Sequence, residues 1–179
     1  MQMTILGIDA SYTRTGVAIS IDGELKIVRS IKFKGCKTKT AKRANLRAKL
    51  QRYIDKYKPD LVVCERTRQF STGGNKSFIA MNMIKTGISI LTAIIDVAYE
   101  NNIEVMSVDT RAWKSAVIGT SKPKGGNKKL PALEYVHSLG FDVHDDDDAA
   151  DSACISLFYW YSMRKNGEKR TRDLLKLEE

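Results

Sequence analysis

Three apolar, β-rich runs follow one another within the first 33 residues, and their order limits how the chain can begin to fold. They cover residues 4–8, 16–21 and 25–33. Asp22-Gly23 joins the second run to the third, and both residues tolerate the positive φ angles of a two-residue hairpin turn. The sequence therefore predicts that the chain opens as an antiparallel meander of three strands.

The pattern changes after residue 40, where predicted helices and strands alternate. Leu46, Leu50 and Ile54 recur at helical spacing, and a short β-rich run at residues 60–65 follows them. The remaining predicted elements are a strand at 103–108 and helices at 77–101, 111–118, 129–139 and 147–163. Because a strand reached through a helix tends to lie parallel to its neighbour, we expect an α/β fold. It has a mixed five-stranded sheet, three antiparallel strands and then parallel strands, flanked by helices.

Length and composition favour one domain of this kind. The chain has 179 residues, 42% of them hydrophobic, and we place a single domain at residues 1–163 and a charged tail at 164–179. No apolar run approaches the roughly 18 residues that suggest a membrane-spanning helix, and the first residues lack the basic region of a signal peptide. Cys36, Cys64 and Cys154 match no zinc motif. We expect a cytoplasmic protein with no membrane contact.

Basic residues outnumber acidic ones, giving a formal net charge of +9, and they gather in two segments. The first segment comprises Lys32, Lys34, Lys37, Lys39, Lys42, Arg43, Arg47, Lys49, Arg52, Lys56 and Lys58, with Asp55 as its one acidic residue. The second comprises Lys122, Lys124, Lys128 and Lys129, interleaved with glycines. This distribution indicates a polyanionic partner, and nucleic acid is the leading candidate. A basic surface that serves only solubility is the alternative, and charge alone does not separate the two.

Four acidic residues stand where predicted elements end or begin. Asp9 and Glu65 close two apolar runs, and Asp148 and Asp151 lie three residues apart where a helix is predicted to begin. Strand ends and a first helical turn can meet at one edge of an open sheet, and carboxylate oxygens are ligands that Mg²⁺ prefers. We therefore expect a site for two Mg²⁺ ions, which Mn²⁺ can replace. Each acid taken singly also fits a turn or a cap, and residues 145–147 compete with Asp148 for its role.

Two metal ions held in this way hydrolyse phosphodiesters by activating a water and stabilising the leaving alkoxide. His144 stands just before the acidic string and is a candidate general base, with an ordinary loop residue as the alternative. Lys128 or Lys129 is a candidate to approach the scissile phosphate or only to steer it.

Taken together, these residues resemble the RuvC-type Holliday-junction resolvases of the RNase H-like superfamily. The motifs that carry the resemblance are Gly-Ile-Asp-Ala-Ser at 7–11 with Thr15-Gly16, Val-Val-Cys-Glu at 62–65, Trp113-Lys114, and Asp-Ala-Ala-Asp-Ser-Ala at 148–153. Each motif is short, and their order and spacing over about residues 4–160 make the combination more specific.

The resemblance implies an RNase H-like fold and a Mg²⁺-dependent endodeoxyribonuclease of DNA recombination and repair. A homodimer formed through the helix at 77–101 would nick opposing strands of a four-way junction symmetrically. The compact, basic form looks like a phage or viral branch, which would also act on forks and flaps. The family's aromatic residue after the glutamate has no close match here, because Phe70 comes late and Arg68 takes the nearest position.

The expected site residues follow from the motifs and the charge pattern. Asp9, Glu65, Asp148 and Asp151 are the expected metal ligands and, with Lys129 and His144, the expected catalytic residues. The expected DNA contacts are Arg68, Phe70, Lys76, Lys114, Lys122, Lys124 and Lys128.

Two other functions are weighed against this one. A non-enzymatic branched nucleic-acid-binding module would share the basic surface, but four uncompensated carboxylates would repel phosphate. The spacing Asp9-x-Ser11-x-Thr13-x-Thr15-Gly16 is similar to the first phosphate loop of actin-like and sugar-kinase ATPases. That class needs two such domains around the nucleotide, and this chain is too short for them and lacks a second phosphate loop.

Overall fold

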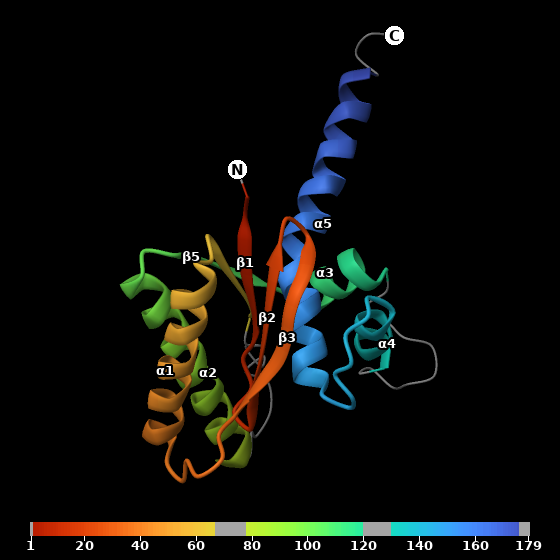
Figure 1. Cartoon of the computed structure of the whole chain (residues 1–179). Helices are drawn as coiled ribbons and strands as arrows, with labels where there is room; N and C mark the ends of the chain where they lie inside the picture. The colour runs from red at the N-terminus through yellow and green to blue at the C-terminus, as the bar shows by residue number, and fades with distance from the viewer. Residues whose placement is uncertain (1, 67–77, 120–129, 176–179) are drawn as a thin grey trace.

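The computed structural model describes residues 2–66, 78–119 and 130–175, with the backbone alone for residues 78–86 and 164–175. Its centre is a five-stranded sheet in the order β3-β2-β1-β4-β5, and helices lie on both faces (Figure 1). The strand order and the mixed strand directions confirm the predicted α/β fold.

The strands begin and end close to the predicted positions. They are β1 Thr4–Asp9, β2 Arg14–Ile21, β3 Glu24–Lys32, β4 Leu61–Glu65 and β5 Glu104–Val108. The first three are antiparallel, whereas β4 runs parallel to both β1 and β5. Asp22 and Gly23 have φ angles of 50° and 83°, so the hairpin turn forms where the sequence predicts it. Because β1 and β4 are parallel neighbours, their carboxyl ends meet at one edge of the sheet.

The helices are α1 Lys39–Tyr57, α2 Phe78–Glu100, α3 Thr110–Trp113, a π-helical turn η1 Lys114–Ile118, α4 Leu130–Ser138 and α5 Asp147–Leu175. Thr38 caps α1, because its side chain accepts a hydrogen bond from the Ala41 amide. Lys58, in the left-handed conformation, ends the helix. Within the described segments, no helix is both long and apolar enough to span a membrane.

The last helix is longer than the sequence suggested. It was expected to end near Met163, whereas α5 continues to Leu175 and projects past the sheet (Figure 1). The additional segment, residues 164–175, contains no proline, and eight of its twelve residues are Arg, Lys, Leu or Glu, which favour helix. The expected domain boundary after residue 163 stays a prediction.

Each face of the sheet has its own hydrophobic core. On one face α5, with α3, η1 and α4, packs over Ile5, Ala18 and Val63. On the other face α1 and α2 pack over a separate cluster that includes Leu6 and Ile19. The alternation of buried residues along β1 therefore supplies both cores.

Helix α5 lies unusually close to the sheet, because two glycines face it. A Cβ atom added at Gly16 would come 1.8 Å from the Asp148 carbonyl oxygen, and one added at Gly7 would come 2.5 Å from the Ser152 carbonyl oxygen. Ser20 of β2 also donates a hydrogen bond to the buried Ser156 carbonyl at 3.1 Å. The part of α5 from Asp148 to Ser156 is therefore fixed directly over β1 and β2.

The substitution Gly16→Ala tests this contact. The added methyl group has no space, so we expect the start of α5 to shift and the free energy of unfolding to fall by about 1–3 kcal/mol. Urea denaturation measures the loss, and Ser20→Ala, which removes one hydrogen bond without adding bulk, is the comparison. Unchanged stability in Gly16→Ala would contradict the close contact.

Candidate metal-binding site

The four predicted carboxylates come from three elements that meet at one edge of the sheet. Asp9 is the last residue of β1 and Glu65 the last of β4, and the residues before them, Ile8 and Cys64, are register partners. Asp9 also lies opposite Gly16, the residue over which the backbone of Asp148 packs. The strand pairing and the glycine contact thus bring the strand ends and the start of α5 together.

The electrostatics of Asp9 show that the four acids form one cluster. Burial raises the pKa of Asp9 well above its ordinary value, and the negative charges of Glu65, Asp151 and Asp148 raise it further. A side-chain hydrogen bond with Asp148 acts on the Asp9 pKa in the same direction. Charges act in this way on a side chain in the same region, so the structure brings Glu65, Asp148 and Asp151 near Asp9.

Asp151 has a buried carboxylate oxygen that lacks a hydrogen-bond donor among the described residues. Its Oδ1 atom is buried and has no hydrogen-bond partner in the described part of the chain. Burial raises the pKa of Asp151 to about 7, an effect that the nearby Lys114 ammonium opposes and that Glu65 increases. A buried carboxylate oxygen without a donor is a position where a cation would be favourable.

Glu65 is held in place by two donors. Thr110 Oγ1 donates to Oε1 at 2.5 Å, and the indole Nε1 of the buried Trp113 donates to Oε2 at 3.0 Å. Asp109 caps the short helix that carries both donors, because its side chain accepts from the Arg111 amide. Supporting hydrogen bonds of this kind orient the carboxylate ligands of metal sites.

Arg14 neutralises the other side of the cluster. Its Nε donates to Asp148 Oδ2 at 2.5 Å, and its Nη2 donates to Asp147 Oδ1 at 2.8 Å. Asp146 has two further roles, accepting from Ser30 Oγ at 2.6 Å and from the Ala149 amide at 3.1 Å as a cap of α5. The Asp146 and Asp147 side chains are thus occupied, and Asp148 is the residue of the string that shifts the pKa of Asp9.

The cluster fits a divalent cation in composition, although its side chains are not arranged as an ion cage. Among the described residues, no three acidic, histidine or cysteine side chains are placed to hold one ion. Asp148 is turned toward Arg14, and Glu65 is bonded to α3. The four converging carboxylates and the unpaired Asp151 oxygen nevertheless offer the hard oxygen ligands that Mg²⁺ and Mn²⁺ prefer.

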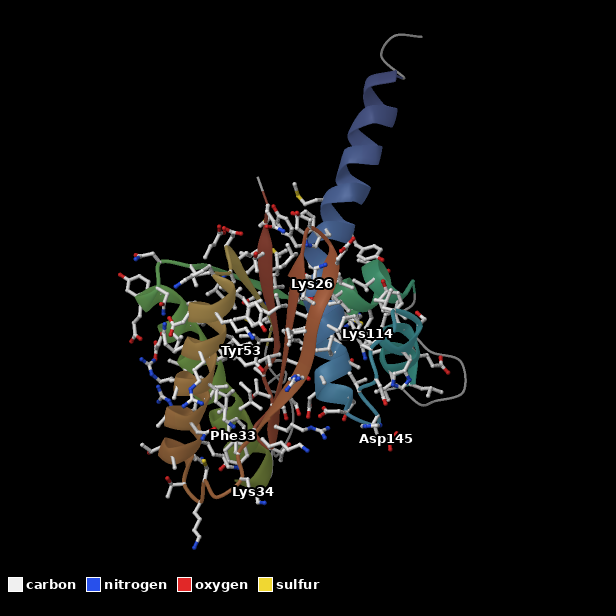
Figure 2. All side chains as sticks on the ribbon, viewed as in Figure 1. Lys26, Phe33, Lys34, Tyr53, Lys114 and Asp145 are labelled. Atoms are coloured by element: carbon white, nitrogen blue, oxygen red, sulfur yellow. The ribbon has the colours of Figure 1, made fainter. Side chains whose placement is uncertain are left out.

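Of the remaining predicted site residues, Lys114 lies near the carboxylates, whereas the others lie apart from them or outside the described segments. His144 is in the left-handed conformation, its side chain is 86% exposed, and its Nδ1 lies 3.2 Å from Asp142 rather than from the cluster. Asp145 lies on the exposed loop before α5, at the lower end of the molecule in Figure 2. Lys114 is near Asp151. The predicted residues that lie outside the described segments are Arg68, Phe70, Lys76, Lys122, Lys124, Lys128 and Lys129.

Sequence reasoning missed three partners of the carboxylates. Arg14 begins a strand without any motif, and Thr110 follows a strand end as an ordinary helix-start residue. Trp113 belongs to a segment that resembles the family's, but the sequence assigns it no role. The position of a Trp shortly after a predicted strand end was the one signal in the sequence, because an indole N–H that becomes buried there needs an acceptor.

The raised pKa of Asp151 predicts a pH-dependent stability. Between about pH 4 and pH 7 the folded protein keeps this proton while the unfolded chain loses it, so stability falls as pH rises through this window. Asp151→Asn should remove that loss and raise the free energy of unfolding at pH 7.5, without divalent ions, by about 1 kcal/mol or more. Denaturant titrations at several pH values measure this. The exposed Asp145→Asn is the control, and equal effects of the two would refute the burial of Asp151.

The comparisons with known proteins place the fold. No protein-family model and no curated protein sequence matches the chain. The structure is similar to that of Thermus thermophilus RuvC bound to a Holliday junction substrate, with a TM-score of 0.68 and 15% identity over 91% of this chain and 96% of that chain. A second Thermus thermophilus RuvC structure gives a TM-score of 0.67 and 18% identity, covering 92% and 97% of the two chains.

A eukaryotic protein shares the same architecture. The yeast mitochondrial Holliday junction resolvase Ydc2 matches with a TM-score of 0.55 and 16% identity, covering 95% of this chain and 83% of that chain. At these identities the similarity concerns the fold. The chain has an RNase H-like fold, in the arrangement that these junction resolvases also have.

Proposed function

We propose that the protein is a Mg²⁺-dependent endonuclease that cleaves Holliday junctions, and also forks and flaps, by two-metal phosphodiester hydrolysis. The observation that carries this proposal is the convergence of four carboxylates in a chain of net charge +9. Such a cluster would repel the phosphate groups of a nucleic acid unless cations bridged the carboxylates to the phosphate. The fold shared with RuvC, a protein whose structure contains a Holliday junction, supports the same substrate class.

In this mechanism each carboxylate has a distinct position. Asp9 would be the ligand that both ions share, with Glu65 as a further ligand of one ion and Asp148 and Asp151 as further ligands of the other, because the charges of all three acids act on Asp9. When bound, the ions lower the pKa of a water and stabilise the leaving oxygen. Thr110 and Trp113 keep the Glu65 carboxylate oriented throughout, because they engage both of its oxygens.

Cationic residues complete the proposed site. Arg14 now bonds Asp147 and Asp148, and Lys114 lies near Asp151, so both can meet a phosphate that approaches the cluster. We assign Lys129 to the leaving group and keep His144 as a candidate base, which would have to leave its contact with Asp142.

Further DNA contacts are proposed from residues with basic or aromatic side chains. They are Arg68, Phe70, Lys76, Lys122, Lys124 and Lys128. Their segments follow β4, which ends at Glu65, and precede α4, which packs against α5. We also assign the protein to a phage or viral branch of these nucleases.

The proposed enzyme is a homodimer through α2. Ile88, Ile95 and Tyr99 are 51%, 42% and 82% exposed, and their spacing places them on one side of the helix. The opposite side, including Ile90 and Ile94, is buried against the sheet. An exposed apolar stripe on a helix that already packs a core suggests a protein partner, and a second copy would double the active sites.

A non-enzymatic junction-binding module is the second candidate, and one observation favours it. Arg14 bonds two acids of the string, and no described group forms an ion cage. A binding protein could use such pairing to mask the carboxylates from phosphate. Mg²⁺-dependent nicking of branched DNA separates the two functions, because the binding module would show none.

Removing a metal ligand should abolish cleavage and spare binding. In Asp9→Asn or Glu65→Gln, we expect nicking of a labelled four-way junction to fall by more than the roughly 10- to 100-fold typical of losing a supporting residue. Junction affinity should stay the same or increase, because a negative charge is removed. Gel assays of nicking and binding measure both, with Asp145→Asn as the control. Retained cutting in either variant would refute the metal assignment.

Placing a charge on the exposed stripe should break the dimer. Ile95→Asp is expected to weaken dimerisation by at least roughly 100-fold, because two copies of an apolar side chain worth about 1.5 kcal/mol or more would be lost. Analytical ultracentrifugation measures the equilibrium. Leu139→Asp, in the turn directly after α4 and similarly exposed at 43%, is the matched control. A monomeric parent protein, or equal effects of both substitutions, would contradict the α2 interface.

A further inference from the structure

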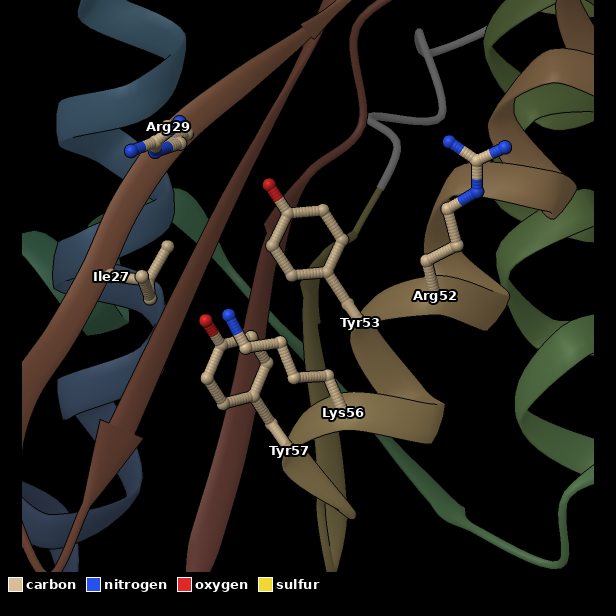
Figure 3. Close-up of a pocket in the computed structure, with 6 residues that line it drawn as sticks. All are labelled: Ile27, Arg29, Arg52, Tyr53, Lys56 and Tyr57. Carbon is tan, nitrogen blue, oxygen red and sulfur yellow. The ribbon is translucent and has the colours of Figure 1, made fainter.

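A cationic pocket lies on the face of the sheet opposite to α5. Its volume is about 280 Å³, and Figure 3 shows it between β3 and the C-terminal half of α1. The lining residues are Ile27, Arg29, Arg52, Tyr53, Lys56 and Tyr57. Arg29 and Ser30 are adjacent on the edge strand β3, and Ser30 contacts Asp146 on the α5 face. The pocket and the acidic string are thus on opposite faces of the same edge strand.

The three cations of the pocket have no acidic partner among the described residues. Arg29, Arg52 and Lys56 make no ion pair there, and the Lys56 ammonium lies 5.0 Å from the centre of the Tyr57 ring. Unpaired cations that share a cavity repel one another, and an anion would remove that repulsion. The pocket therefore has the charge of an anion-binding site.

Other basic residues of α1 do have acidic partners, in contrast to the three cations of the pocket. Arg43 lies 3.6 Å from Asp96 of α2, and Arg47 lies 2.7 Å from Glu100. The basic segment noted in the sequence thus divides into two flanks of α1. One flank joins α1 to α2 through ion pairs, whereas Arg52 and Lys56 on the other flank line the pocket and make no ion pair among the described residues.

Two tyrosines add hydrogen-bond donors to the pocket. The Tyr53 and Tyr57 rings stack with their centres 6.2 Å apart, and Figure 3 shows both hydroxyl groups directed toward β3. Burial raises the pKa of Tyr53, so its hydroxyl keeps its proton and can donate. Guanidinium, ammonium and phenol donors around one cavity are the groups that bind phosphate.

A row of lysines connects the pocket with the carboxylate edge. Lys49 donates to the Lys32 carbonyl at 3.2 Å, and the Lys42 ammonium lies 3.6 Å from the centre of the Tyr12 ring, in the loop that follows Asp9. From Lys42 to Lys56 the helix rises about 21 Å, which matches about six nucleotides at roughly 3.4 Å each. In Figure 2, Tyr53 lies higher along α1 than Phe33 and Lys34, which lie near the lower end of that helix. A linear polyanion fits this row better than a single small anion does.

We propose that the Arg29–Arg52–Lys56 pocket binds a backbone phosphate of a nucleic-acid strand that continues along α1 from the carboxylate cluster. The strand's identity as DNA rests on the proposed nuclease function, while its binding here needs neither metal nor cleavage. This surface would hold an arm of the substrate on the sheet face away from the candidate active site.

The test compares two double variants of equal charge. Arg52→Ala/Lys56→Ala removes two pocket cations, and Arg43→Ala/Arg47→Ala removes two cations that are already paired with α2. Fluorescence anisotropy with a labelled four-way junction in EDTA gives Kd over a range of salt concentrations. We expect the pocket variant to reduce the slope of log K against log salt by about 1–2, and the control to leave it nearly unchanged. Equal slopes in the two variants would overturn the proposal.

Two further arms keep the result interpretable. Arg29→Gln, on β3, should reduce the slope by about 1 even if the double variant is unstable, and thermal melting checks the fold of each protein. Thymidine monophosphate should compete with the junction only weakly; effective competition would overturn the proposal by showing a mononucleotide site. Nicking by the parent protein in Mg²⁺ is measured separately. Absence of nicking would contradict the proposed nuclease function, whereas an unchanged salt slope in the pocket variant would contradict the proposed phosphate pocket.

Discussion

The approach of α5 to β1 and β2 is the contact on which the rest of the structure depends. Gly7 and Gly16 leave space for the helix backbone, and small residues along α5, including Ala149, Ala150 and Ser152, are buried against the strands. With a side chain at Gly16, the Asp148 carbonyl could not occupy its position. The Asp148 and Asp151 carboxylates therefore reach Asp9 because Gly7 and Gly16 have no side chains that would hold α5 away from the sheet.

This packing concentrates negative charge, and the surrounding residues offset only part of it. Burial and neighbouring acids raise the pKa of Asp9, and burial raises the pKa of Asp151 to about 7. Arg14 and Lys114 act in the opposite direction on Asp148 and Asp151. A fold that keeps such a cluster gives up stability at neutral pH, which is typical of functional sites.

The sequence predicted the elements that depend on local pattern. The hairpin at Asp22-Gly23 and the crossovers through α1 and α2 follow from turn chemistry and periodicity, and together they fix the sheet order. The sequence pattern did not predict which side chains form hydrogen bonds with the carboxylates. Arg14 lies more than 130 positions from the acids it bonds, and no spacing rule connects them. The extension of α5 to Leu175 was missed because a charged segment without an apolar stripe carries no signal of packing.

The most direct test of the central claim is a crystal structure of the protein soaked in MnCl₂, with anomalous scattering used to locate the ions. The account predicts anomalous peaks in coordination contact with Asp9 and with carboxylates of Glu65, Asp148 or Asp151, and Arg14 displaced from Asp148. No peak near Asp9, with Arg14 still bonded to Asp147 and Asp148 at saturating Mn²⁺, would contradict it.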